Sequence, residues 1–185
     1  TGLTVDGVEA TAQNVLDGNY SVARPFEMVY MEENLTDVER AFIDFASSTD
    51  GLDILESNGT IVDTTNAQVF DMSKYADLSG NLVMGGSTST EAAVKALADE
   101  FTALFPKVTY EYNATGSGAG VKNATDGTYT LGFASREIKE SELETGLTAV
   151  TLCMDGIALV VNPSNNLSDI SKDEIKEVYT GVITE

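Results

Sequence analysis

Three short segments in the second half of the chain most constrain its fold. They are GGSTST at Gly85–Thr90, ATGSGAGVK at Ala114–Lys122 and GFASRE at Gly132–Glu137. Each follows an apolar run of the β type, and the first two lead into a helical pattern. A strand that ends in glycine and hydroxyl residues and then opens a helix leaves several backbone N–H groups free and aligned. Two such loops and an arginine in one α/β pattern indicate a site for a small oxyanion.

The first 79 residues predict a few short elements. Apolar residues at Val38, Ala41, Phe42 and Phe45 have the 3.6-residue period of a helix, and Thr36 with the glutamate three residues later forms a capping box. We also expect strands at 3–5 and 26–31 and helices near 11–16 and 50–57. A polar, aperiodic stretch then connects the two halves.

Strands and helices alternate in the second half. We expect strands at 82–84, 108–112, 129–134, 149–153 and 157–162, with a turn at Asp155-Gly156 between the last two. We expect helices at 91–105, 118–125, 141–143 and from the Ser171 cap to Tyr179, with Glu174 completing a second capping box. This alternation predicts an α/β fold with a mostly parallel sheet and helices on both faces. In such sheets, ligands bind beyond the carboxyl ends of the strands.

Composition excludes several classes of function. Thirty acidic against ten basic residues give a net charge of −20, which argues against nucleic acid or an anionic membrane as a partner. Any anion site must therefore act through local hydrogen bonds, and the acidity otherwise simply solvates the surface. The chain has no histidine and one cysteine, Cys153, so zinc sites and His- or Cys-based catalysis are not expected. We also expect no membrane span and no cofactor.

Residues 80–185 resemble the first lobe of the phosphate-binding protein of bacterial phosphate ABC importers, which has a type II periplasmic-binding-protein fold. The resemblance runs through GGSTSTEAAVKALADEF, NATGSGAGVKNATDGTYTLGFASREIK, DGIALVVNP and SKDEIKEVYTGVIT. Residues 1–66 resemble the carboxyl-terminal segment of the same family, through VDGVEATAQNVLDGNYSVARPF and FIDFASSTDGLDILESNGTIV. Residues 67–79 connect the two segments.

The order of these segments differs from the family pattern that the resemblance implies. The carboxyl-terminal segment comes first, and the second lobe is missing. We therefore expect residues 1–185 to form a single, circularly permuted lobe, which termini that lie close together make physically reasonable. Excision from a protein with tandem binding-protein repeats is the simpler origin, and a natural permutant is the alternative.

The resemblance also assigns candidate ligands. Thr88 and Ser89 would offer hydroxyl and backbone donors where a helix begins, and Ser117 would do the same from the glycine-rich loop. Glycines at 116, 118 and 120 would let the backbone approach the ligand. The alternatives are that Ser87–Thr90 is simply a helix cap and that Gly116–Gly120 is simply a tight turn.

Arg136 occupies a position where the best-known members of the family carry aspartate. That aspartate accepts a proton from phosphate and so rejects sulfate, whereas an arginine would pair directly with an oxyanion. The resemblance therefore does not carry the family's filter between phosphate and sulfate over to this chain. Arg136 has an alternative role in a structural ion pair, for example with Asp155, and we expect Arg24 to be structural.

The resemblance implies a non-enzymatic, solute-binding lobe of an ABC transporter receptor. Its expected partners are phosphate or a similar oxyanion, the second lobe of the parent protein and an ABC permease, and its expected location is extracellular or on the cell surface. Without the second lobe we expect weak binding. An extracellular scaffold or adhesion module that kept the fold is the alternative, and an enzyme is a distant third because the serine-rich loops have no histidine base.

Overall fold

The computed structural model describes residues 1–183, and these divide into two compact units. The larger unit, Arg24–Cys153, is called the sheet unit here. The second, called the small unit, comprises Thr1–Ala23 together with the described residues from Met154 onward. The single-lobe organisation expected for residues 1–185 remains a prediction.

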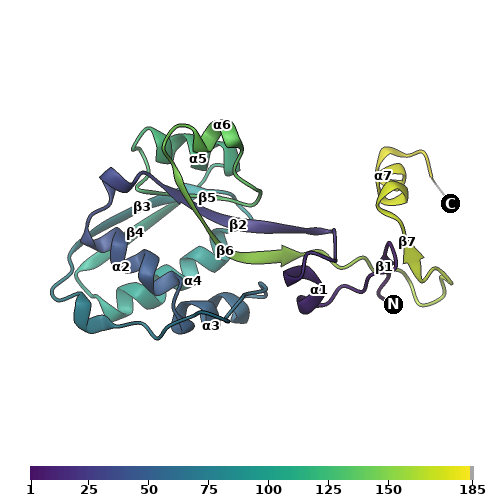
Figure 1. Ribbon diagram of the computed structural model, residues 1–185, viewed down its shortest axis with the longest axis horizontal. Coiled ribbons are helices and arrows are strands. Elements are labelled where there is room, and N and C mark those ends of the chain that lie inside the picture. The colour runs from purple at the N-terminus through teal and green to yellow at the C-terminus, as the bar shows by residue number, and fades with distance from the viewer. Residues whose placement is uncertain (184–185) are drawn as a thin grey trace. The chain divides into compact units, whose positions relative to one another are not determined.

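A five-stranded sheet forms the centre of the sheet unit (Figure 1). Its strand order is β4-β3-β5-β2-β6. β3 pairs in parallel with both β4 and β5, while β2 runs antiparallel to β5. The sheet is therefore mostly parallel with an antiparallel addition. The strands are β2 (Ala23–Tyr30), β3 (Gly80–Gly86), β4 (Val108–Ala114), β5 (Leu131–Ala134) and β6 (Thr148–Gly156).

Helices cover both faces of this sheet, as predicted. Figure 1 shows one group of helices below the sheet and another above it. The lower group is α2 (Asp37–Ala46), α3 (Thr49–Ser57) and α4 (Glu91–Leu104); the upper group is α5 (Ser117–Thr125) and α6 (Glu140–Leu143). Two short 3₁₀ helices, Glu32–Asn34 and Met72–Lys74, lie in the connections.

The main core lies between the sheet and the lower helices. Phe101 of α4 packs edge-on against Phe42 of α2, with ring centroids 5.4 Å apart, and touches Phe105 at 4.9 Å. All three rings are buried, and they join residues from both sides of the connector in one apolar cluster. A smaller cluster beneath the upper helices contains Val29, Val121, Ala124, Ala134 and Leu147.

Local capping signals are confirmed where the sequence predicts them. Thr36 and Glu39 form the capping box at the start of α2, and Ser171 and Glu174 form another at the start of α7 (Lys172–Thr180). Such reciprocal caps satisfy amides that the first helical turn leaves without partners.

The small unit contains β1 (Thr4–Val5), α1 (Ala12–Leu16), β7 (Asp169–Ile170) and α7, with β1 and β7 paired in parallel. The predicted strand at 157–162 is wrong, and so is the turn at Asp155-Gly156, because β6 extends through both of those residues. Residues 157–162 instead make scattered backbone bonds to the first residues of the chain, including an isolated bridge between Gly2 and Val160. An apolar run without a regular neighbouring strand gains no continuous ladder.

Candidate oxyanion site

Three parallel strands bring the glycine- and serine-rich loops to one edge of the sheet. β3 ends at Gly86 and is followed by Ser87, while β5 ends at Ala134 and is followed by Ser135. β4 leads through Thr115 and Gly116 into α5. Since β3 is parallel to both neighbours, the three carboxyl ends share this edge.

Three serine side chains join the loops. The Ser87 hydroxyl donates to Ser135 Oγ at 2.9 Å. The Ser135 backbone N–H donates to Ser117 Oγ at 3.1 Å, and the Ser117 and Ser135 hydroxyl oxygens are 3.4 Å apart. The structure therefore places Ser117, at the start of α5, against the residues that follow β3 and β5.

Ser87 is buried, and both its hydroxyl and its carbonyl group form hydrogen bonds. Its hydroxyl oxygen accepts the Ser89 N–H at 3.2 Å. Its carbonyl oxygen accepts the Tyr112 hydroxyl at 2.7 Å and the Thr90 hydroxyl at 2.9 Å. Burial raises the pKa of Tyr112 to about 12, so the phenol stays neutral and remains a donor.

Two glycines let α5 approach the sheet at this edge. A Cβ on Gly86 would lie 2.1 Å from the Phe133 carbonyl oxygen and 3.0 Å from the Gly120 Cα atom. A Cβ on Gly120 would lie 2.6 Å from the same oxygen and 2.7 Å from the Gly86 Cα atom. Gly120 thus serves helix–sheet packing rather than the approach of a ligand that we expected from sequence. Gly118, by contrast, has open space where its Cβ would be.

The two helices beside the serines begin without side-chain caps. Thr90 precedes α4 and Gly116 precedes α5, and neither provides a side-chain capping bond. In α5 the Gly120 N–H donates to the Gly116 carbonyl, so the amides of the preceding first turn have no intrahelical acceptor. Thr88 and Ser89 lie in the exposed turn before α4. Amide donors and the positive ends of two helix dipoles therefore lie on either side of the serine contact.

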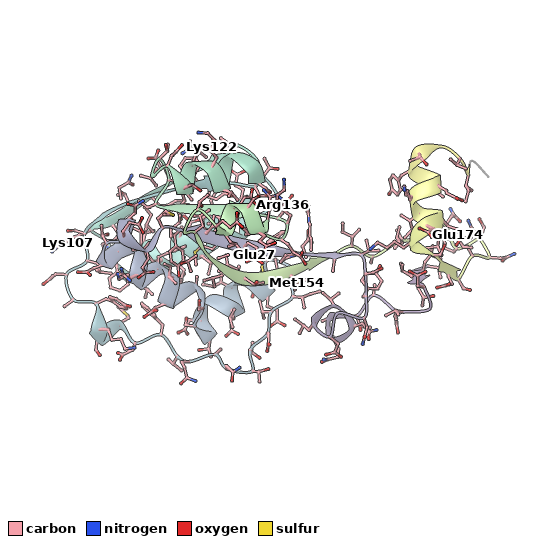
Figure 2. All side chains as sticks on the ribbon, turned by 45° about the horizontal axis from the view of Figure 1, so that its top comes forward. Glu27, Lys107, Lys122, Arg136, Met154 and Glu174 are labelled. Atoms are coloured by element: carbon pink, nitrogen blue, oxygen red, sulfur yellow. The ribbon has the colours of Figure 1, made fainter. Side chains whose placement is uncertain are left out.

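Arg136 follows Ser135 and forms an ion pair with Glu142 of α6. Its Nη1 and Nη2 atoms lie 2.9 and 2.8 Å from the two carboxylate oxygens, and Nη1 also donates to the Glu137 carbonyl. Figure 2 shows Arg136 beside α6. The guanidinium holds the pKa of Glu142 down at about 2, helped by the Lys139 backbone N–H. The structure thus shows an ion pair with Glu142, which sequence reasoning did not find.

Arg24 reaches the same edge from β2. Its Nη1 donates to Ser135 Oγ at 3.5 Å, and its guanidinium carbon lies 5.9 Å from the centre of the Phe26 ring. The antiparallel pairing of β2 with β5, which aligns Glu27 with Ala134, explains this position. We did not predict Arg24 near the loops, because the sequence around Arg24 does not indicate that β2 pairs with the distant strand β5.

Two other contributors, Ser87 and Ser135, lie within the motifs but were not among the expected ligands. The sequence feature that could have identified them is their position directly after strands β3 and β5. Among residues 1–183 there is no group of three or more His, Cys, Asp or Glu side chains that could hold a metal ion, and Cys153 is buried. The same range contains no helix with the length and apolar character of a membrane span.

Comparison with known proteins places this geometry in a family. A family model described as a PBP superfamily domain matches residues 71–185. The chain is 33% identical over 183 residues to the phosphate-binding protein PstS 2 of Streptococcus agalactiae, covering 98% of this chain and 61% of that protein. It therefore spans 61% of the length of that relative.

Two solved structures are also similar. A phosphate ABC transporter phosphate-binding protein from Streptococcus pneumoniae matches with a TM-score of 0.93 and 34% identity, covering 100% of this chain and 70% of that one. A putative phosphate ABC transporter substrate-binding protein from Clostridium perfringens, with bound phosphate, matches with a TM-score of 0.51 and 40% identity, covering 57% of this chain and 44% of that one.

The order of segments along the chain is shared with relatives. An alignment that continues over 183 residues keeps the segments that precede and follow the connector in the same order in the S. agalactiae protein. The segment order that we interpreted as a circular permutation therefore also occurs in this relative. The proposed origin by excision from tandem repeats remains a prediction. The chain belongs to the PBP superfamily, in the family of phosphate ABC transporter phosphate-binding proteins.

Proposed function

We propose that this chain supplies oxyanion-binding groups of a phosphate receptor. Thr88, Ser89 and Ser117 donate hydroxyl and backbone hydrogen bonds to phosphate at the starts of α4 and α5. The contact of Ser87, Ser117 and Ser135 carries the proposal, because it joins both helix starts at one sheet edge. Local donors of this kind overcome the repulsion of a chain with net charge −20.

Arg136 supplies the positive charge in this proposal. A guanidinium has five N–H donors, and the bonds to Glu142 and Glu137 use three of them. Two donors remain for an oxyanion while Glu142 fixes the side chain. Arg136 donates hydrogen bonds and cannot accept one, so this position offers no acceptor for the proton of a protonated phosphate. We therefore expect sulfate to compete with phosphate.

The relatives support the same class of function. Those named above are described as phosphate-binding or substrate-binding proteins of ABC transporters, and the C. perfringens structure contains phosphate. By extension, we infer a non-enzymatic, exported receptor component that delivers its ligand to an ABC permease. A second lobe closing over the ligand belongs to this proposal, as in other binding proteins of this kind.

The chain alone is expected to bind weakly. Closure of two lobes excludes water and supplies donors from both sides, so a single set of donors loses several bonds. Hydrogen bonds to charged groups contribute about 1.5–3 kcal/mol each, and about 1.4 kcal/mol is a tenfold change in affinity. Losing three or four donors therefore takes a micromolar site to a millimolar dissociation constant or beyond.

Site variants test the assignment. We expect Ser117→Ala and Ser89→Ala each to weaken phosphate binding by about tenfold, corresponding to one hydrogen bond to a charged ligand. Ser73→Ala is the matched control, because the Ser73 hydroxyl bonds to Asp71 and lies in a different loop. Nuclear magnetic resonance titration with phosphate up to tens of millimolar measures all three. Equal affinity of the Ser117 variant and the control would contradict the proposal.

A further inference from the structure

The serine contact has a direction that follows from counting donors and acceptors. A hydroxyl oxygen has one proton to donate and two lone pairs to accept with. Ser87 Oγ accepts the Ser89 N–H and donates its own proton to Ser135 Oγ. The orientation of Ser87 is fixed independently through its carbonyl, which accepts two hydroxyls.

Ser135 Oγ then has both lone pairs occupied. It accepts the Ser87 hydroxyl at 2.9 Å and the Arg24 guanidinium at 3.5 Å. Its own proton is left to donate, and the neighbouring acceptor is Ser117 Oγ at 3.4 Å. The geometry between these two oxygens permits either direction, so the occupied lone pairs of Ser135 decide it.

Ser117 Oγ receives two donors as a result. The Ser135 backbone N–H reaches it at 3.1 Å, and the Ser135 hydroxyl reaches it at 3.4 Å. With its lone pairs filled, Ser117 has its proton left for a group outside the cluster. Ser117 is half-buried in the first turn of α5, the turn whose amides are free to bind an anion.

We propose that Ser135 is a positioning residue that orients the Ser117 hydroxyl as a donor toward the bound oxyanion. The identity of the ligand in this inference rests on the proposed function. The proton order, meaning which hydroxyl donates to which within the cluster, does not depend on it. Every hydrogen bond in the cluster is donated in the same direction. Arg24 and Ser87 donate to Ser135, Ser135 donates to Ser117, and Ser117 donates to the ligand. The cluster therefore presents a donor and selects for acceptor oxygens, which phosphate and sulfate share.

Neutron diffraction from crystals of the deuterated chain tests the proton order without any ligand. We expect the Ser135 deuteron to lie on the line to Ser117 Oγ and the Ser117 deuteron to point out of the cluster. A Ser117 deuteron directed at Ser135 Oγ would overturn the proposal.

A double-mutant cycle tests the effect on binding. We expect Ser135→Ala to weaken phosphate binding about fivefold in the wild-type background and by less than twofold in a Ser117→Ala background, while Ser135→Thr restores most of the loss. Equal losses in both backgrounds, at unchanged thermal stability, would refute positioning through Ser117. If no variant or wild-type protein binds phosphate, the proposed function fails, and the neutron result still decides the proton order.

Discussion

The two compact units differ in how they bury apolar surface. In the sheet unit, aromatic rings from α2 and α4 and strand residues are almost completely inaccessible. Of the ten large apolar side chains that the described residues expose, seven belong to the small unit. α7 is a clear example, since it has an apolar face but none of its residues is buried.

This contrast separates a region with a large apolar core from one that buries only a few apolar side chains, among them Leu3, Val5, Val15 and Tyr20. Hydrophobic burial contributes about 25 cal/mol per Å², so the sheet unit gains most of the available stabilisation. In the small unit, a two-residue strand pair, backbone bonds between residues far apart in the sequence and capping bonds add to the few buried apolar side chains. The candidate oxyanion site lies entirely within the sheet unit. A ligand-binding edge on a rigid core allows donors to be positioned in advance.

The largest expected effect is the loss of a core ring. Phe101→Ala removes the side chain that contacts Phe42, Phe45 and Phe105. We expect the free energy of unfolding to fall by about 4 kcal/mol because of lost burial and a residual cavity. Urea unfolding followed by circular dichroism measures the change. A loss below about 1 kcal/mol would remove the basis for calling the sheet unit the stable region.

The close approach of α5 to the sheet should be nearly as sensitive. Gly86→Ala places a methyl group 2.1 Å from the Phe133 carbonyl oxygen and 3.0 Å from the Gly120 Cα atom of α5. It also requires an alanine at a φ of 138°. We expect a destabilisation of about 3 kcal/mol, at the upper end of the overpacking range. Gly118→Ala is the matched control and should be neutral or stabilising by about 0.5 kcal/mol, because its Cβ meets open space. Similar thermal melts for the two variants would show that the helix does not pack as described.

The Arg136–Glu142 pair predicts a dependence of stability on pH. The pKa of Glu142 falls from its ordinary value of 4.5 to about 2 on folding, so the pair stabilises the folded state above pH 4.5. That contribution is lost as the pH falls toward 2. We expect Glu142→Gln to reduce the unfolding free energy by about 2 kcal/mol at pH 7 and to have little effect near pH 2. Denaturation at both pH values measures the difference.

The exposed Lys95–Glu91 pair provides the comparison for that experiment. Both side chains are more than one-third exposed, and such helical pairs contribute about 0.3–0.5 kcal/mol. Glu91→Gln should therefore change the unfolding free energy far less than Glu142→Gln at pH 7. Equal changes would mean that the Arg136 pair is an ordinary surface ion pair.

The smallest expected effect lies in the small unit. Tyr179 of α7 is 82% exposed, so Tyr179→Ala should change the unfolding free energy by less than about 0.5 kcal/mol. Urea unfolding under the conditions used for Phe101→Ala provides the direct comparison. A loss above about 2 kcal/mol would show that α7 packs against apolar surface in solution, and the contrast between the units would then be wrong.

The sequence predicted features that depend on local pattern. Periodic apolar residues and the capping box at Thr36 predicted α2, and the loops after β3 and β4 led to the starts of α4 and α5. The pairing of distant segments was not predictable in the same way. The antiparallel return of β2 brings Arg24 to Ser135, and Glu142 reaches Arg136 from a later turn. Long-range register of this kind depends on tertiary packing rather than on neighbouring residues.

The strand wrongly predicted at 157–162 also shows that strand formation depends on pairing with distant segments. Residues 157–161 form a continuous apolar run, and the expected ladder still does not form in the small unit. The close packing of Gly86 against Gly120, where an added Cβ would lie within 3.0 Å of the facing Cα atom, was not predictable either, since glycine in a loop has many uses. Motif positions were therefore predictable, while the contacts that orient their side chains required the structure.

Titration of phosphate into the isotopically labelled chain, followed by amide chemical shifts, tests the central claim most directly. We expect a dissociation constant in the millimolar range at moderate salt, with shift changes concentrated at the amides of Thr88, Ser89, Ser117 and Arg136 in the sheet unit. We expect no comparable change in β1, β7 or α7. A micromolar constant for this chain, or shifts centred on the small unit, would contradict the proposal of a partial oxyanion site built from the serine loops.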